Sequence, residues 1–235
     1  MTGTIYLIPV TLGGNDPAMV IPEKVLSVTG QLRYFVVENL RSARRYLRLI
    51  DKKFPIDDSV FAELNEHTPD SDISSFLDPV LNGSDMGVMS EAGLPGIADP
   101  GTGLILLAHK MNIRVVPLSG PSSMLLALIS SGLTGQNFSF NGYLPVNPVD
   151  RVSAIRQLEK RSRDGYSQIF METPYRNQKL LDTILDTCND RTLLCIALNI
   201  TQSGESIRTM TIADWKKMRS SINDQLAVFI LQNPE

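Results

Sequence analysis

The residues best placed to do chemistry lie between Ser90 and Gly101, in the stretch S-E-A-G-L-P-G-I-A-D-P-G. This stretch follows the apolar run Met86–Met89, and its three glycines and two prolines cannot continue a strand. Glycines let the backbone approach a bound molecule closely, whereas prolines hold a loop rigid. Glu91 and Asp99 can accept hydrogen bonds from ligand hydroxyls or amines. We therefore predict a ligand-binding loop here; the alternative is a tight surface connection.

Two familiar phosphate-binding patterns do not fit this loop. A P-loop needs a glycine, four residues and then Gly-Lys-Ser/Thr; Gly96 and Gly101 have that spacing, but Thr102 stands where the lysine should be. The dinucleotide fingerprint G-x-G-x-x-G is found neither here nor elsewhere in the chain. A strand, a Gly-rich loop and a helix therefore predict a cofactor site without naming the cofactor.

The loop resembles the signature S-D-A-G-T-P-x-I-x-D-P-G of the ribosomal small-subunit methyltransferase I group, which belongs to the tetrapyrrole methylase superfamily. Four other stretches resemble the group in the same order: Ile5–Pro9, Val115–Ser122, Phe138–Pro145 and Phe170–Arg176. Together these blocks span nearly the whole chain and form a specific signal. The resemblance implies an S-adenosyl-L-methionine-dependent methyltransferase that acts on a ribose 2′-hydroxyl of small-subunit rRNA.

The resemblance also implies which residues contact the cofactor. Most of them would act through backbone groups, because Gly, Leu, Ile and Ala have no polar side-chain atoms. The implied contacts are Pro9, Gly93, Leu94, Ile97, Asp99, Ser122, Ser123, Met171, Ala197, Leu198 and Ala227. For Met171, Leu198 and Ala227, plain strand core is the alternative interpretation.

The acceptor side of the resemblance departs from the group at three places. Residues 38–41 read E-N-L-R where the group has E-D-T-R, residues 198–202 read L-N-I-T-Q where it has R-E-L-T-K, and residues 64–68 read L-N-E-H-T beside its L-H-D-H-N-E. A ribose hydroxyl is a poor nucleophile while protonated and benefits from a general base. We select Glu38 as the candidate base and Arg41 as the candidate phosphate or ribose anchor, with His67 and Glu172 behind them. An ordinary surface Glu-Arg pair is the alternative.

Alternating strands and helices must position these residues in the first half of the chain. Apolar runs predict the strands, and periodic stretches bounded by Pro, Gly or Asn predict the helices. The predicted strands are Thr4–Pro9, Arg33–Val37, Val60–Leu64, Met86–Met89 and Ile113–Pro117, and the predicted helices are Pro22–Val28, Ser42–Lys53, Ser71–Leu81 and Leu104–Ala108. This alternation predicts a mainly parallel sheet covered on both faces, with the ligand at the carboxyl ends of its strands.

The turn Ser119–Ser122 is the predicted boundary between an N-terminal α/β domain, residues 1–118, and a C-terminal domain, residues 119–235. The second domain is richer in strands, so we predict a mixed sheet and an α/β fold overall. Its predicted strands are Phe138–Tyr143, Gln168–Glu172, Leu193–Leu198, Ser206–Thr211 and Leu226–Leu231, and its predicted helices are Met124–Ile129, Val152–Arg161 and Arg176–Thr187. The resemblance to tetrapyrrole methylases implies two lobes, with the cofactor in the cleft between them.

Charge limits how this protein can hold RNA. The chain has 22 Lys and Arg against 25 Asp and Glu, a net charge of -3, so any RNA contact must be local. Two sets of basic residues are candidates, and ordinary solvated helix faces are the alternative for both. The sets are Arg41, Arg44, Arg45, Arg48 and Lys52, and Arg151, Arg156, Lys160, Arg161 and Arg163.

Cysteine and histidine usage and the apolar runs indicate the compartment. Cys188 and Cys195 fit reduced core thiols better than a disulfide framework, and two histidines without paired cysteines give no support to a zinc site. No apolar run is long enough to span a bilayer, and the opening residues show no basic leader, so we expect a cytoplasmic protein.

Three functions compete at this point. The first is methylation of ribose in small-subunit rRNA, the second is methylation of a small molecule such as a tetrapyrrole-like ring, and the third is a cofactor-binding interaction protein without catalysis. We also expect a homodimer, because tetrapyrrole methylases pair and because the apolar stretch Met124–Ile129 suits an interface. The alternative is that this stretch completes the core of the monomer.

Overall fold

The first half of the chain folds around a parallel sheet in the computed structural model, which describes residues 2–218 and 221–234. The chain divides into two compact units, Met1–Ser122 (unit 1) and Ser123–Glu235 (unit 2). The sequence places a domain boundary between residues 118 and 119, and the structural division falls at the end of the same Ser-Gly-Pro-Ser turn.

Unit 1 contains five parallel strands in the order β3-β2-β4-β1-β5. They are β1 (Thr4–Ile8), β2 (Tyr34–Val37), β3 (Val60–Glu63), β4 (Met86–Met89) and β5 (Arg114–Pro117). The central strand β4 pairs with both β1 and β2, and all four of its residues are buried. A strand buried on both faces needs a continuous apolar run, which explains the sequence of β4.

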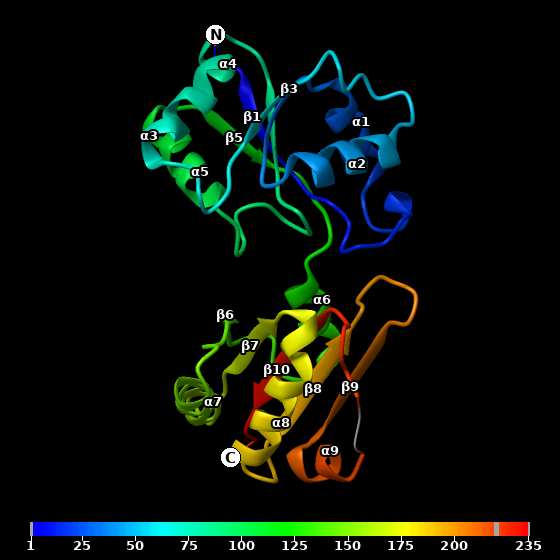
Figure 1. The fold of residues 1–235 in the computed structure, drawn as a ribbon, viewed down its shortest axis with the longest axis vertical. Coiled ribbons are helices and arrows are strands. Elements are labelled where there is room, and N and C mark those ends of the chain that lie inside the picture. The colour runs from blue at the N-terminus through cyan, green and yellow to red at the C-terminus, as the bar shows by residue number, and fades with distance from the viewer. Residues whose placement is uncertain (1, 219–220, 235) are drawn as a thin grey trace. The chain divides into compact units, whose positions relative to one another are not determined.

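Helices cover both faces of this sheet (Figure 1). They are α1 (Glu23–Gln31), α2 (Leu40–Ile50), α3 (Asp70–Ile73), α4 (Asp78–Leu81) and α5 (Gly101–Lys110), with 3-10 turns at Pro17–Met19 and Ser74–Leu77. Phe35 and Val37 of β2 pack against Leu47 of α2 on one face. Val36 points to the other face, where it joins a cluster with Leu104 of α5. Alternate side chains of β2 thus pack into two separate hydrophobic cores, one on each face of the sheet.

Two predicted helices of unit 1 differ from the observed ones. The predicted helix Ser71–Leu81 is broken into α3, a 3-10 turn and α4, because Pro79 has no N–H to donate and its ring crowds the preceding turn. The predicted helix Pro22–Val28 is also too short, since α1 continues through Gly30 to Gln31. Glycine costs helix stability but does not end a helix by itself.

Unit 2 contains a mixed sheet in the order β6-β7-β10-β8-β9. Its strands are β6 (Phe138–Tyr143), β7 (Ser167–Glu172), β8 (Leu193–Leu198), β9 (Ser206–Thr211) and β10 (Ala227–Gln232). Strands β6 and β7 are parallel, whereas the other neighbouring pairs are antiparallel. The mixed sheet predicted for the second half is therefore present.

The helices of unit 2 divide between the two faces of its sheet (Figure 1). They are α6 (Ser123–Ser131), α7 (Pro148–Ser162), α8 (Asn177–Thr187) and α9 (Ile212–Met218), with a 3-10 turn at Pro174–Arg176. Helices α7, α8 and α9 cover a core in which the rings of Phe170 and Phe229 stack at 5.6 Å, and α6 packs on the opposite face. Helix α9 is absent from the sequence-based prediction because only Ile212 and Trp215 mark its buried side, too few for a visible period.

The two sheets with their helices confirm the predicted α/β fold class. Cys188 and Cys195 are both buried and unpaired, as the sequence predicts. Within residues 2–218 and 221–234, no helix is long and apolar enough to cross a membrane. The same residues contain no group of three His, Cys, Asp or Glu side chains arranged to hold a metal ion.

Candidate active site

The order of the strands creates a crevice at the carboxyl edge of the unit 1 sheet. The connections that leave β1 and β2 run toward β3, whereas those that leave β3 and β4 run toward β5. At the adjacent ends of β2 and β4 the chain therefore departs in opposite directions. Ligands of open α/β sheets bind at such a switch point.

The loop that follows β4 is built at this edge and is braced by one carboxylate. Asp99 accepts hydrogen bonds from the backbone N–H of Gly96 at 2.6 Å and of Gly101 at 2.7 Å. Gly96 and Ala98 have left-handed backbones, with φ of 85° and 57°. Asp99 thus fixes the shape of the loop from within, and its carboxylate still has lone pairs for another donor.

Gly93 lies where the loop meets the end of β1. Its φ is 71°, and its carbonyl accepts the N–H of Val10 at 2.9 Å. A Cβ added at Gly93 would lie 3.3 Å from Leu12 and 3.4 Å from the carbonyl oxygen of Pro121. The ends of β1 and β4 and the segment after β5 therefore converge on a backbone position that only glycine suits.

The convergence gathers most of the unit 1 residues assigned to the cofactor. Pro9 is buried beside Gly120, where an added Cβ would lie 2.1 Å from the Cβ of Pro9. Ser122 is also buried, while Leu94 is half-buried and Ile97 is exposed on the same loop. Ser123 is the first residue of α6 and belongs to unit 2.

Glu38, the candidate base, directly follows β2 at the crevice. Its Oε2 accepts the backbone N–H of Glu91 at 2.9 Å, and Glu91 in turn accepts the hydroxyl of Ser42 at 2.8 Å. Burial raises the pKa of the Glu38 carboxyl above its ordinary value of 4.5, and the negative charges of Glu91 and Asp99 push it the same way against the N–H hydrogen bond. A carboxyl poised in this way is a better proton acceptor than a fully solvated one.

The other acceptor-side candidates lie in different settings. Arg41 is exposed on the first turn of α2 and forms no ion pair within the described chain, so it and Glu38 are not a surface salt bridge. His67 is exposed, 3.6 Å from Glu66. Glu172 is buried in unit 2, where its Oε1 accepts both Nε and Nη2 of Arg176 at 2.9 and 2.5 Å. That engagement indicates a structural clamp rather than a free base.

The unit 2 residues assigned to the cofactor form a second group, at one end of the sheet. Ala227 begins β10 and pairs with Leu198 at the end of β8 and with Glu172 at the end of β7. The next residue of β10 pairs with Met171 and Ala197. Ala197 and Ala227 are buried and Met171 and Leu198 are half-buried, so their side chains belong largely to the sheet and their backbone groups are what they can offer a ligand.

Sequence reasoning missed two polar residues of α2 that face the crevice. Ser42 ties the helix to Glu91, and the Tyr46 hydroxyl donates to the carbonyl oxygen of Pro9 at 3.0 Å. Tyr46 is buried on the apolar side of α2. A tyrosine at a core position needs a hydrogen-bond partner for its hydroxyl, and this requirement could have indicated its contact from the sequence. The second basic set also needs correction, because Arg151 is buried and binds the carbonyl oxygens of Pro145 and Val146 instead of joining an exposed face.

Comparison with known proteins identifies the relatives of this chain. No family model matches it. Ribosomal RNA small subunit methyltransferase I of Vibrio cholerae is 30% identical over 210 residues, which cover 89% of this chain and 69% of the relative. The proteins of the same name from Pseudomonas aeruginosa and Escherichia coli O157:H7 are each 27% identical, over 91% and 90% of this chain and 73% and 70% of their own lengths.

Solved structures show the same fold at lower identity. The methyltransferase CobJ superposes with a TM-score of 0.64 at 17% identity, covering 99% of this chain and 95% of its own. Uroporphyrin-III-C-methyltransferase from Thermus thermophilus gives a TM-score of 0.59 at 15% identity, with coverage of 99% and 93%. The fold, the ordered sequence blocks and the identity to the Vibrio cholerae protein agree: this chain belongs to the ribosomal RNA small subunit methyltransferase I family, a family of methyltransferases.

Proposed function

We propose that this protein transfers the methyl group of S-adenosyl-L-methionine to a ribose 2′-hydroxyl of small-subunit rRNA. The observation that carries the proposal is the convergence of Pro9, Gly93 and Gly120 at the carboxyl edge of a parallel sheet, next to the half-buried carboxyl of Glu38. The names of its relatives support rRNA as the acceptor.

The residues present fit this donor. A side chain at Gly93 would press on Leu12 and the Pro121 carbonyl, so the glycine keeps the backbone bare where a ligand would approach it. Adenine and methionine can both be gripped by main-chain N–H and C=O groups. Within unit 2, Met171, Ala197, Leu198 and Ala227 lie together at one end of the sheet and could offer a ligand backbone groups of the same kind.

The work of the protein is alignment and proton removal. Bound S-adenosyl-L-methionine supplies a methyl group already activated by its positive sulfur, so positioning provides most of the rate. Glu38 would take the hydroxyl proton as the ribose oxygen bonds to the methyl carbon. Arg41, which is exposed and unpaired in the described chain, would hold a neighbouring phosphate.

Gly93→Val tests the donor site directly. The β-branched side chain would fill the space that the ligand needs, so we expect calorimetry to show loss of S-adenosyl-L-methionine binding and assays with labelled donor and small ribosomal subunits to show loss of methyl transfer. The matched control is Gly165→Val: Gly165 has a similar φ of 79°, but an added Cβ meets nothing within 4 Å. Both variants bear the same backbone strain, and the control should keep binding and transfer.

Two results would contradict the proposal. If the wild-type protein does not bind the donor at millimolar concentration, the cofactor assignment is wrong. If it binds the donor but methylates a low-molecular-weight fraction of the cell extract and not small subunits, the acceptor is a small molecule instead.

The assembly and compartment form part of the same proposal. We propose a homodimer in the cytoplasm, where ribosomal subunits are available. Leu125 and Ile129 support the dimer, because they lie one turn apart on α6 with 43% and 76% of their surface exposed.

A further inference from the structure

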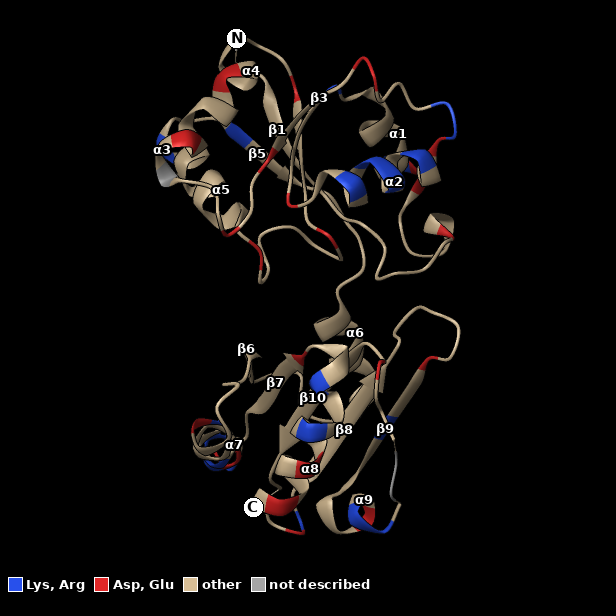
Figure 2. Cartoon of the chain, viewed as in Figure 1, with Lys and Arg blue, Asp and Glu red and all other residues tan. Residues whose placement is uncertain are grey.

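Positive charge is concentrated on one helix of this acidic protein. Residues 40–53 contain six of the 22 Lys and Arg side chains and a single acid, Asp51, although the whole chain has a net charge of -3. Arg41, Arg44, Arg45 and Arg48 are all exposed on α2. Their spacing places them within an arc of about 100° on the helix. They form a blue band along α2 in Figure 2, which we call the α2 arginine face.

The charges of the α2 arginine face are not neutralised. Within the described residues, none of the four arginines forms an ion pair with an acid. The guanidinium of Arg44 lies over the ring of Phe61 at 5.3 Å, and Arg48 donates to the carbonyl oxygen of Lys52 at 2.8 Å. Both contacts fix a guanidinium in place without cancelling its charge, as a preorganised anion site requires.

A hollow of about 400 Å³ lies beside this face. Three segments line it: the segment after β1, from Val10 to Asn15; the helix α2, through Ser42, Arg45 and Arg48 among others; and the start of the loop after β4, at Ser90 and Glu91. Its volume falls in the range of small-ligand pockets, about 300–1,000 Å³. Glu38, the candidate base, does not line the hollow itself, but it accepts the backbone N–H of Glu91, which does.

The charge of the side chains that line the hollow indicates which of two molecules binds there, the methyl donor or the RNA. Arg45 and Arg48 outweigh the one acid that lines the hollow, Glu91, and this net positive charge disfavours the positive sulfonium of S-adenosyl-L-methionine. A nucleotide carries a negative phosphodiester, which guanidinium groups bind in a bidentate manner. The hollow has room for one nucleotide of a strand, and unpaired strands are the form of RNA whose bases and riboses can be presented singly.

We propose that the α2 arginine face binds the phosphate backbone of single-stranded RNA and that the hollow beside it takes one nucleotide of that strand. This inference rests on the proposed function, because it names the surface by which the rRNA acceptor is held. Arg41 to Arg48 span about 10 Å of helix, the rise of roughly three stacked nucleotides. Arg45 and Arg48 contact the strand where it enters the hollow.

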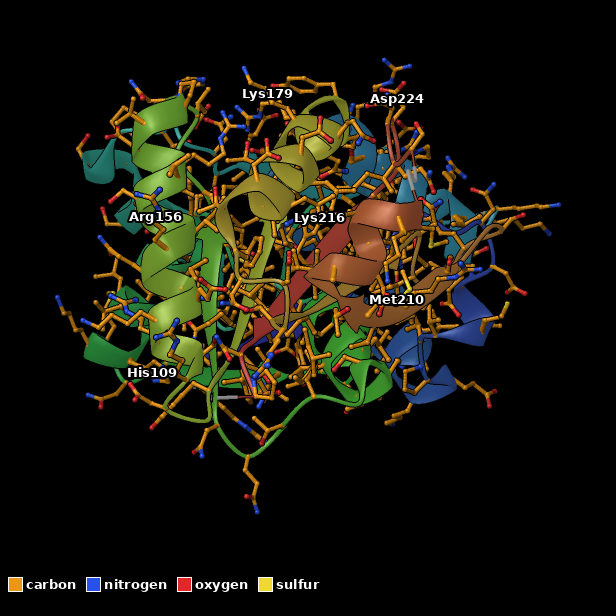
Figure 3. All side chains as sticks on the ribbon, turned by 90° about the horizontal axis from the view of Figure 1, so that it is seen from below. His109, Arg156, Lys179, Met210, Lys216 and Asp224 are labelled. Atoms are coloured by element: carbon orange, nitrogen blue, oxygen red, sulfur yellow. The ribbon has the colours of Figure 1, made fainter. Side chains whose placement is uncertain are left out.

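Helix α7 provides a matched control. Its Arg156 and Lys160 lie on an open surface lined by that helix alone, and Arg156 is labelled in Figure 3. Acidic neighbours on the same helix, Asp150 and Glu159, offset part of its charge, and Arg151 is buried. Removing two positive charges there changes the net charge of the protein as much as removing two from α2.

The test is fluorescence anisotropy of a fluorescein-labelled single-stranded oligouridine across a series of KCl concentrations, without donor. Arg45→Gln with Arg48→Gln should weaken binding about tenfold, as expected for two exposed charge contacts. It should also reduce the slope of log K against log salt by about 1.4, since each phosphate contact on a single strand contributes about 0.7. Arg156→Gln with Lys160→Gln should change neither quantity. Circular dichroism melts check that both variants stay folded.

Several results would overturn the inference. Equal losses in the two double variants would mean that net charge, not the α2 arginine face, governs binding. Equal or tighter binding of an RNA hairpin duplex would exclude a single-strand site. Because the assay needs neither donor nor turnover, it separates this inference from the proposed function. If the wild type methylates small subunits but the α2 double variant binds RNA normally, the α2 arginine face is refuted as the RNA site and the proposed function stands.

Discussion

At the scale of single residues, the proposed catalytic role of Glu38 comes with a cost in stability. Its Oε2 is held by the N–H of Glu91, while burial and the charges of Glu91 and Asp99 raise its pKa. Folding therefore shifts the balance toward the protonated carboxyl, whereas proton transfer from a ribose hydroxyl needs the ionised one. A partly buried carboxyl that must be ionised for catalysis lowers the stability of the folded protein, which is a common trade-off between activity and stability.

Glu38→Gln should reveal both effects. We expect kcat to fall roughly a hundredfold, the usual contribution of a general base, with donor affinity kept. Because the folded-state pKa is raised, the wild type should lose stability relative to Glu38→Gln as the pH rises from 4.5 through that pKa, and the difference should level off above it. Denaturant midpoints measured across this pH range give the answer. A difference that does not vary with pH would show that the carboxyl is not perturbed.

At the scale of elements, α2 links the candidate active site to the proposed RNA surface. Asn39 caps the helix by accepting the N–H of Ser42 at 3.0 Å, and the Ser42 hydroxyl binds Glu91 of the loop after β4. The Tyr46 hydroxyl fastens the next turn to Pro9. One helix thus sets the positions of the arginines relative to the loops at the carboxyl edge of unit 1.

Asn39→Ala should disturb that position as well as stability. Loss of the cap costs about 1 kcal/mol, which lowers Tm by about 2–4 °C for a chain of this size. RNA affinity should fall as well, because the first turn of α2 carries Arg41 and Ser42. Asn147→Ala is the control: Asn147 caps α7 in the same way, through the N–H groups of Val149 and Asp150. It should lower Tm similarly and leave RNA affinity unchanged; equal effects on affinity would contradict the role of α2.

At the scale of the whole molecule, the proposed dimer can be measured directly. Sedimentation equilibrium should give twice the mass of 26.0 kDa across micromolar concentrations. Ile129→Glu places a charge on the most exposed apolar side chain of α6 and should shift the equilibrium toward monomer, since burying an unpaired charge is costly. Met19→Glu, an equally exposed position on unit 1, is the control for added charge. A wild type that sediments as a monomer throughout would refute the dimer.

Local sequence patterns were enough to predict the alternation of strands and helices and the position of the candidate ligand loop. Apolar runs such as Met86–Met89 admit few structures other than buried strands, and the glycines and prolines of residues 90–101 cannot continue them. The ordered family-like blocks added the fold and the methyltransferase chemistry. The sequence did not predict the break within Ser71–Leu81 or the short helix α9. Such short segments contain too few residues for a clear periodic pattern, so packing in the folded chain determines their structure.

The contacts between distant residues became visible only in the folded chain. Glu38 and Glu91 are 53 positions apart in the chain, and no local pattern shows that the N–H of one binds the carboxylate of the other. The structure likewise left Arg45 exposed beside a hollow and buried Arg151, although both looked like members of basic helix faces. Strand order brings Glu38 to Glu91 and gathers the loops beside Arg45, because it places the ends of distant strands at one edge. Periodicity within a segment carries no information about strand order.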